Sequence, residues 1–322
     1  MALLSVILPS YNEEEILSLT ARRLGEVLSK EDIAYQLVFV DDGSDDGTWD
    51  RIREAADADP GITGIRFSRN FGKEAAIFAG LAWSRGDCAA VMDCDLQHPP
   101  ETLVKMYRLW EEGYEVIEGV KKSRGSESRI HSLSARAFNR IMSGATHIDM
   151  SAASDFKLLD RRAVDVLLHM PERNTFFRAM SCWIGFKTAT VQFDVMEREA
   201  GSSKWSTRSL VHYAITNIAA YSSLPMQMVT GAGVFSLLLS LILGIHTIAK
   251  YLSGHAVEGF TTVILLILLL GSIVMISLGI IGYYISQIYE EVKARPRYIV
   301  SQTIADRPPA RSGKSQNLKK KI

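Results

Sequence analysis

The 322-residue sequence predicts an α/β domain with a mostly parallel sheet, followed by interfacial helices and two membrane-spanning helices. Short apolar runs alternate with helical stretches over residues 1–205, which is the pattern of βαβ units. Asp, Glu, Lys and Arg are then absent from Ser209 to Ala249 and again from Gly259 to Tyr289. Each gap holds an apolar run long enough to cross a bilayer. The charges therefore divide the chain into two parts.

Four runs in the amino-terminal part are typical of buried strands, and a helical stretch follows each of them. The predicted strands are Ser5–Leu8, Gln36–Val40, Gly64–Phe67 and Ala89–Met92. The predicted helices are Glu13–Ser29, Thr48–Ala58, Lys73–Ser84 and Pro100–Glu112. Because ligands of such sheets bind beyond the carboxyl ends of the strands, we expect the polar residues that follow these runs to form the functional site.

The two apolar runs of the carboxyl-terminal half are Met228–Ala249 and Phe260 to about Ile285. A pair of buried core helices is the alternative, but the stretch Val263–Leu270 is apolar on every helical face, which favours membrane spans. We therefore predict four regions. They are a cytoplasmic domain (1–205), interfacial amphipathic helices (206–227), two transmembrane helices (228–288, spans about 228–249 and 260–285) and a basic cytoplasmic tail (289–322).

The flanking charges predict the orientation of the two spans. Nine basic and three acidic residues follow Tyr289, so the tail carries +6 and the rest of the chain −6, since the formal net charge of the whole chain is +0. The positive-inside rule places both termini in the cytoplasm and the short connection Lys250–Gly259 outside. Pro308, Pro309 and the run Lys319–Lys321 predict that the tail is a flexible arm on anionic lipid.

Composition excludes several classes of function. A net charge of +0 argues against a general nucleic-acid binder, which would carry a basic excess. The three cysteines, Cys88, Cys94 and Cys182, form no CxxC pair, so neither a disulfide framework nor a structural zinc site is expected. The amino terminus has no basic stretch before its short apolar run, so we expect no signal peptide and a cytoplasmic amino-terminal half.

Polar motifs follow three of the predicted strands. Pro9-Ser-Tyr-Asn-Glu13 follows the first and Asp41-Asp-Gly-Ser44 the second, although an acidic pair before Gly-Ser is also typical of an ordinary turn and helix cap. In an extended segment after the fourth strand, Asp93, Asp95 and Gln97 would share one face. Two carboxylates and an amide oxygen suit a hard divalent ion that carries a diphosphate, whereas a solvated turn is the alternative.

Five ordered motifs together resemble those of family 2 glycosyltransferases with the GT-A fold. They are Pro9–Glu13, Asp41–Ser44, Arg69–Glu74, Asp93–Gln97 and Arg198–Trp205. With the two spans that follow, the chain is similar in particular to the bacterial polyprenyl-phosphate (bactoprenol) glycosyltransferases and more distantly to dolichol-phosphate mannose synthase. The resemblance covers nearly all of the chain, to about Ile299.

The resemblance implies roles on the donor side. The residues that match the family's nucleotide-sugar pocket are Pro9, Tyr11, Glu13, Asp42, Asn70, Lys73 and Asp93. Among them, Asp42 would bond the uracil edge or the ribose of a UDP-sugar. Asp93, Asp95 and Gln97 match the site for the diphosphate and a divalent metal, Mg²⁺ or Mn²⁺.

The acceptor side is implied by basic residues in the third quarter of the chain and just before the first span. A lipid monophosphate brings close to two negative charges, which Arg and Lys side chains bind well, although many such residues are simply solvated. The residues that match the family's phosphate-binding groups are Arg129, Arg140, Arg198, Ser203 and Lys204. Asp155 matches the family's Asp near the acceptor.

The sequence departs from the family pattern at two places. Ser154 precedes Asp155 where relatives commonly have Gly, which changes the local backbone but keeps the carboxylate. The second span ends in Gly282-Tyr-Tyr-Ile-Ser-Gln287 where the family usually has two charged residues, so this chain lacks both charges there.

The matches imply an inverting transfer of glucose or N-acetylglucosamine from a UDP-sugar to undecaprenyl phosphate, at the cytoplasmic face of the bacterial inner membrane. Asp95 and Asp155 would be the catalytic pair, with Asp155 orienting the substrates, because a phosphate with a second pKa near 6 needs no full base. Alternatives are a membrane-tethered transferase that acts on a saccharide hydroxyl, and a non-catalytic scaffold or flippase component. Two lone spans beside a large domain also suggest a small homo-oligomer.

Overall fold

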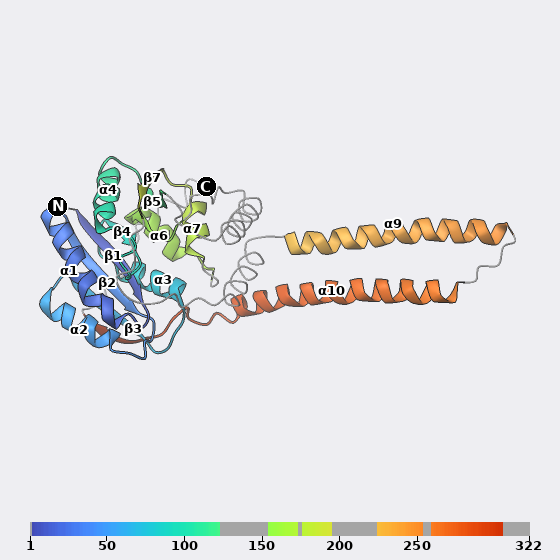
Figure 1. The fold of residues 1–322 in the computed structure, drawn as a ribbon, viewed down its shortest axis with the longest axis horizontal. Coiled ribbons are helices and arrows are strands. Elements are labelled where there is room, and N and C mark those ends of the chain that lie inside the picture. Colours follow the sequence, from blue (N-terminus) through green and yellow to red (C-terminus); the bar gives the residue numbers. More distant parts are fainter. Residues whose placement is uncertain (1, 123–153, 173–175, 195–223, 254–258, 305–322) are drawn as a thin grey trace. The chain divides into compact units, whose positions relative to one another are not determined.

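The computed structural model describes residues 2–122, 154–172, 176–194, 224–253 and 259–304 (Figure 1). These residues belong to two compact units. The first unit contains the described residues up to 194 and those from 296 onward, and the second contains those from 224 to 295.

Within the described residues, eight strands of the first unit form one mixed sheet. They are β1 (Leu3–Ser10), β2 (Ala34–Asp41), β3 (Ile62–Phe67), β4 (Cys88–Val91), β5 (Val116–Lys121), β6 (Lys157–Asp160), β7 (Thr188–Phe193) and β8 (Val300–Ile304). Their order across the sheet is β7-β5-β6-β4-β1-β2-β3-β8. The pairs β1–β2, β1–β4, β2–β3 and β5–β7 are parallel, whereas β6 and β8 run antiparallel to their neighbours. The predicted α/β class with a mostly parallel sheet is confirmed, as are the four predicted strands.

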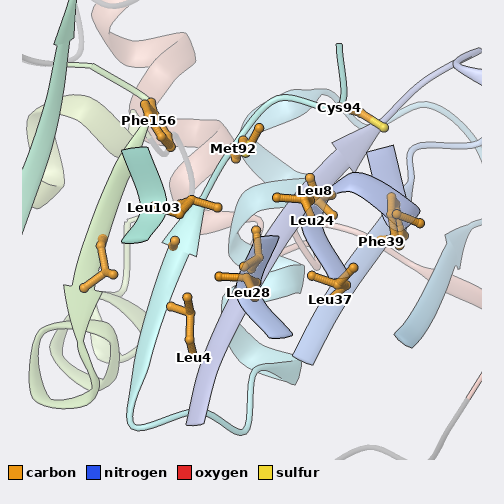
Figure 2. Packing of buried hydrophobic residues seen from close by; sticks show 14 of the residues in the cluster. Leu4, Leu8, Leu24, Leu28, Leu37, Phe39, Met92, Cys94, Leu103 and Phe156 are labelled. Carbon is orange, nitrogen blue, oxygen red and sulfur yellow. The ribbon is translucent and has the colours of Figure 1, made fainter. Parts of the chain in front are cut away.

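Helices cover both faces of this sheet. They are α1 (Glu14–Lys30), α2 (Thr48–Ala58), α3 (Lys73–Trp83), α4 (Pro100–Glu111), α6 (Arg161–His169) and α7 (Phe177–Trp183). Strand side chains alternate between the faces, so Leu8 packs with the cluster under α1, α2 and α4, while its neighbour Ile7 packs with the cluster under α3, α6 and α7. Figure 2 shows Leu8, Leu37 and Leu24 of α1 as members of the first of these clusters. Each such fully buried leucine contributes about 1.5–3 kcal/mol of hydrophobic stabilisation.

The eighth strand lies in a part of the chain that was expected to be a flexible arm. Residues 300–304 pair antiparallel with β3, so this expectation is wrong for them. The strand forms because β3 would otherwise leave an open edge of backbone N–H and C=O groups. Tyr298 and Val300 also pack against the apolar cluster around Phe67 and Trp83. Residues 305–322 lie outside the described residues, so the arm remains a prediction there.

The second unit contains two long apolar helices, α9 (Leu224–Leu252) and α10 (Phe260–Val292), which lie side by side (Figure 1). The segments Met226–Lys250 and Leu269–Val292 have mean hydropathies of 2.2 and 1.9 and are long enough to cross a membrane. Only 6% and 0% of them is buried by the protein, which disfavours the alternative of core helices and indicates membrane association. Both helices exceed the predicted spans, and residues 224–227, expected in the interfacial region, already belong to α9.

Candidate active site

The loops that follow β1 and β2 are tied together by hydrogen bonds. Asn12, whose φ of 54° is left-handed, donates its backbone N–H to the Ser44 hydroxyl at 2.9 Å. Its side-chain oxygen accepts the backbone N–H of Asp45 at 3.0 Å. The Glu13 N–H is bound by the hydroxyl of Thr48 at 2.8 Å. The two polar motifs therefore form one structure at the carboxyl edge of the sheet.

The acidic pair Asp41-Asp42 divides into a turn residue and a loop-binding residue. Asp41 accepts the Ser44 N–H at 2.9 Å and pairs with Arg66 at 3.2 Å, so the ordinary turn interpretation holds for it. Asp42 instead accepts the backbone N–H groups of Phe71 and Gly72 at 2.6 and 2.9 Å. It thus holds the segment before α3, which contains Asn70, one of the residues that the resemblance assigns to the nucleotide-sugar pocket.

Gly43 is the position that allows Asp42 to face this loop. Its φ is +68°, and a Cβ there would lie 2.4 Å from the carbonyl carbon of Arg69. We expect Gly43→Ala to lower the free energy of unfolding by at least about 1–2 kcal/mol for the left-handed backbone, and to weaken nucleotide binding because residue 69 must move. Gly113→Ala is the matched control, because its φ is +90° and its Cβ meets nothing within 4 Å. Equal nucleotide affinity in the two variants would contradict this expectation.

Burial raises the pKa of Asp42 to about 6, although the N–H groups of Phe71 and Gly72 oppose the rise. Activity should therefore fall as the pH drops below about 6, because protonation of Asp42 removes the negative charge of the carboxylate that accepts both N–H groups. The effect on stability has the opposite sign. A carboxyl whose folded pKa is raised binds more protons in the folded state, so its contribution to stability falls as the pH rises from about 4 to about 6. Rate and unfolding measured against pH test both trends. Asp42→Asn should lack the stability trend and show a smaller loss of rate below about pH 6, because the phosphate acceptor that the resemblance implies still gains a proton there.

The acidic motif after β4 forms a turn. The chain leaves the extended conformation after Val91, Leu96 has a φ of 56°, and the Gln97 N–H donates to Asp95 Oδ1 at 3.1 Å. The expectation that Asp93, Asp95 and Gln97 share the face of an extended segment is therefore wrong, because the alternation of side chains ends with the strand.

Two carboxylates from distant parts of the sequence converge on Lys73. The Lys73 Nζ lies 2.5 Å from Asp93 Oδ1 and 3.2 Å from Asp155 Oδ2. Arg178 donates two hydrogen bonds to Asp155, from Nε to Oδ1 at 2.6 Å and from Nη2 to Oδ2 at 2.7 Å. Although burial opposes ionisation, Lys73 and Arg178 hold the pKa of Asp155 well below its usual range. Asp155 is thus a carboxylate fixed by two cations, with little capacity to accept a proton.

Arg178 is a site residue that the sequence did not indicate, and Glu74 was indicated only as the last residue of the motif Arg69–Glu74, with no role of its own. Glu74 accepts the backbone N–H of Phe177 at 2.9 Å and so joins α3 to the start of α7. Burial, followed by the charge of Asp155, raises the pKa of Glu74 to about 7. Arg178 stands in an apolar stretch without a spacing pattern, and only its place in the fold brings it to Asp155.

In the part of the chain that the structure describes, the acidic turn supplies side-chain oxygens but no preformed cluster of metal ligands. Among the described residues, no group of three or more His, Cys, Asp or Glu side chains is placed to hold a metal ion. The oxygen donors Asp93, Asp95 and Gln97 nevertheless fit a hard cation, because Mg²⁺ is usually bound by one or two carboxylates together with phosphates and water. Asp93 is paired with Lys73 in this structure.

The other predicted site residues are placed in two groups. Pro9 lies in β1 opposite Val40, Tyr11 and Glu13 lie half-buried in the following loop, and Asn70 is exposed in the loop held by Asp42. The predicted phosphate-binding residues lie outside the described residues; they are Arg129, Arg140, Arg198, Ser203 and Lys204.

A family model described as Glycosyl transferase family 2 matches residues 5–182. The chain belongs to this family. The GT-A type of fold that the resemblance implied is therefore confirmed.

Within the family, the chain is 37% identical over 304 residues to the uncharacterized glycosyltransferase YkcC of Bacillus subtilis, covering 93% of each chain. It is 32% identical over 307 residues to a bactoprenol glucosyl transferase of Shigella phage SfII, covering 95% of this chain and 99% of the relative. Among solved structures, mannosyl-3-phosphoglycerate synthase from Rubrobacter xylanophilus is 17% identical with a TM-score of 0.47, covering 68% of this chain and 73% of that one.

Proposed function

We propose that this family 2 glycosyltransferase transfers a hexose, glucose or N-acetylglucosamine, from a UDP-sugar to undecaprenyl phosphate with inversion at the anomeric carbon. The observation that carries the proposal is the state of Asp155. A sugar hydroxyl acceptor needs a base, whereas Asp155 is held ionised and paired by Lys73 and Arg178. A phosphate acceptor is already largely ionised near neutral pH and needs no base.

In the proposed reaction, a phosphate oxygen of the lipid forms a bond to the anomeric carbon, and the bond from that carbon to the β-phosphate oxygen breaks. UDP leaves with the electron pair on the opposite face of the sugar. Mg²⁺ or Mn²⁺, bound by Asp93, Asp95 and Gln97, would neutralise charge on the departing diphosphate. Asp42 and its loop would bind the nucleotide, and Lys73 would add positive charge beside the diphosphate.

Relatives and composition support the acceptor and the location. The relatives of the SfII, SfX and SfV phages are named bactoprenol glucosyl transferases and match at 32% identity. The exposed apolar surfaces of α9 and α10 favour a protein in the bacterial inner membrane that crosses it twice. The +6 charge after Tyr289 favours a cytoplasmic location for both termini and for the catalytic domain, next to membrane lipids. The net charge of +0 over the whole chain argues against nucleic acid as a partner. A homo-oligomer remains a prediction from the two lone spans.

One assay separates this function from its alternatives. Purified full-length protein is incubated with radiolabelled UDP-sugars, Mg²⁺ and undecaprenyl phosphate, and the mixture is then extracted into organic solvent. Label in the lipid fraction that depends on both the metal and the lipid phosphate supports the proposal. Label that appears only with a saccharide acceptor would favour transfer to a hydroxyl, and the absence of transfer with every donor and acceptor would favour a scaffold or flippase component.

A further inference from the structure

The segment Arg297–Ile304, here called the C-terminal strap, contacts two elements that lead to site residues, β3 and α3. It begins five residues after the end of α10 and contains β8. Ser68 donates its backbone N–H to the Ile299 carbonyl at 3.0 Å, and the Ser301 hydroxyl donates to the carbonyls of Arg66 and Phe67 at 3.1 Å. The strap is therefore bonded to β3 where this strand leads into the loop held by Asp42.

A line of aromatic rings continues from the strap into that loop. The ring of Tyr298 stacks on Phe67, with centroids 5.0 Å apart and an angle of 14° between the planes. Phe67 meets the ring of Phe71 edge to face at 5.7 Å. The backbone N–H of Phe71 is the group that binds Asp42 at 2.6 Å. Two ring contacts thus separate Tyr298 from a hydrogen bond of the nucleotide pocket.

The first residue of the strap contacts α3 and the residue that follows α6. Arg297 Nη2 donates to the carbonyl of Met170 at 2.8 Å, and the guanidinium carbon lies 5.1 Å from the centre of the Phe78 ring. Phe78 of α3 meets Phe177 edge to face at 6.4 Å, next to Arg178. The strap therefore contacts the helix that begins with Lys73, and this helix packs against the start of α7.

We propose that the C-terminal strap is a positioning element of the active site, in which Tyr298 acts through Phe67 and Phe71 to hold the loop 68–73 in the conformation that binds the nucleotide. Stacked aromatic pairs prefer a defined offset, so loss of the Tyr298 ring frees Phe67 and, through it, the Phe71 backbone. The part of this inference that concerns the nucleotide rests on the proposed function. The part that concerns the loop does not.

The test uses three variants of the full-length protein in detergent. Tyr298→Leu removes the ring but keeps an apolar side chain, Tyr298→Phe keeps the ring, and Gln302→Ala is the matched control at an exposed position of the same strand. Hydrogen exchange of residues 68–73 is measured without substrates, so that it reports on the loop even if the donor is not a UDP-sugar. UDP affinity and the KM values for the UDP-sugar and the lipid phosphate are measured separately.

We expect the rate of hydrogen exchange at Phe71 and Gly72 to rise about two- to tenfold in Tyr298→Leu. This is the fold-change that corresponds to the free energy of one lost aromatic pair. The KM for the donor should rise by a similar factor, with the KM for the lipid phosphate unchanged. Tyr298→Phe and Gln302→Ala should behave like the wild type. Unchanged exchange in Tyr298→Leu, or failure of Tyr298→Phe to restore wild-type exchange, would overturn the proposal. Raised exchange in Tyr298→Leu, together with a wild-type protein that does not bind UDP, would support the positioning role of the strap and contradict the proposal that the donor is a UDP-sugar.

Discussion

Replacement of Asp95 by alanine is expected to reduce sugar transfer to background, whereas Asp155→Asn is expected to retain measurable transfer. Asp95 is a carboxylate of the acidic turn. Without it, the cation that would neutralise the departing diphosphate would lose one of its ligands. Asp155→Asn removes a charge that is already neutralised by Lys73 and Arg178, and the phosphate acceptor does not need it as a base. The measurement is the amount of label transferred to undecaprenyl phosphate per minute. Both variants are first shown to have the same melting temperature as the wild type.

A matched control for the loss of one negative charge is Glu101→Ala, since Glu101 is exposed on the first turn of α4, six residues after Asp95. This variant should transfer sugar at the wild-type rate. Equal and complete loss in Asp95→Ala and Asp155→Asn would make Asp155 an essential base or orienting group. That result would remove the argument for a phosphate acceptor and favour a hydroxyl.

The alternation of apolar runs and helical stretches was sufficient to predict the central strands and their helices, because period and turn residues are local properties of a sequence. The active-site cluster is a different kind of object. Asp155 lies 62 residues after Asp93, and they meet at Lys73 only because β6 inserts antiparallel beside β4. The sequence placed Asp155 near the acceptor through the resemblance alone, and it gave no reason to place Lys73 between the two carboxylates.

The misplaced elements also have physical explanations. The strand Val300–Ile304 is short and mostly exposed, so its sequence lacks the apolar run of a buried strand, and it forms because β3 offers a partner. The acidic motif does not continue β4, because the strand ends at Val91 and Leu96, with a φ of 56°, turns the chain. Arg178 carries no motif, since its role depends on an antiparallel strand and a short helix that meet in three dimensions.

Replacement of Lys157 by methionine is expected to lower the stability of the catalytic domain more than any surface change. Lys157 in β6 is fully buried, and its Nζ lies 3.1 Å from Glu118 of β5 and 2.6 Å from the hydroxyl of Ser181 in α7. Removal of one partner leaves the Glu118 carboxylate buried without its counter-charge, which costs about 3–5 kcal/mol. For a domain of this size that corresponds to a fall in melting temperature of about 6–20 °C.

The double variant Lys157→Met with Glu118→Leu separates the cost of an unpaired charge from the loss of a favourable pair. Because desolvation of two buried charges offsets most of their attraction, the double variant should recover most of the lost melting temperature.

The rate of sugar transfer should respond differently. The Ser181 hydroxyl that binds Lys157 also donates to the carbonyls of Phe177 and Arg178, at 2.6 and 3.1 Å, so the buried Lys157 helps to fix the turn of α7 that carries Arg178. The double variant should therefore be nearly as stable as the wild type and still transfer sugar more slowly. Full activity in the double variant would show that the pair serves stability alone.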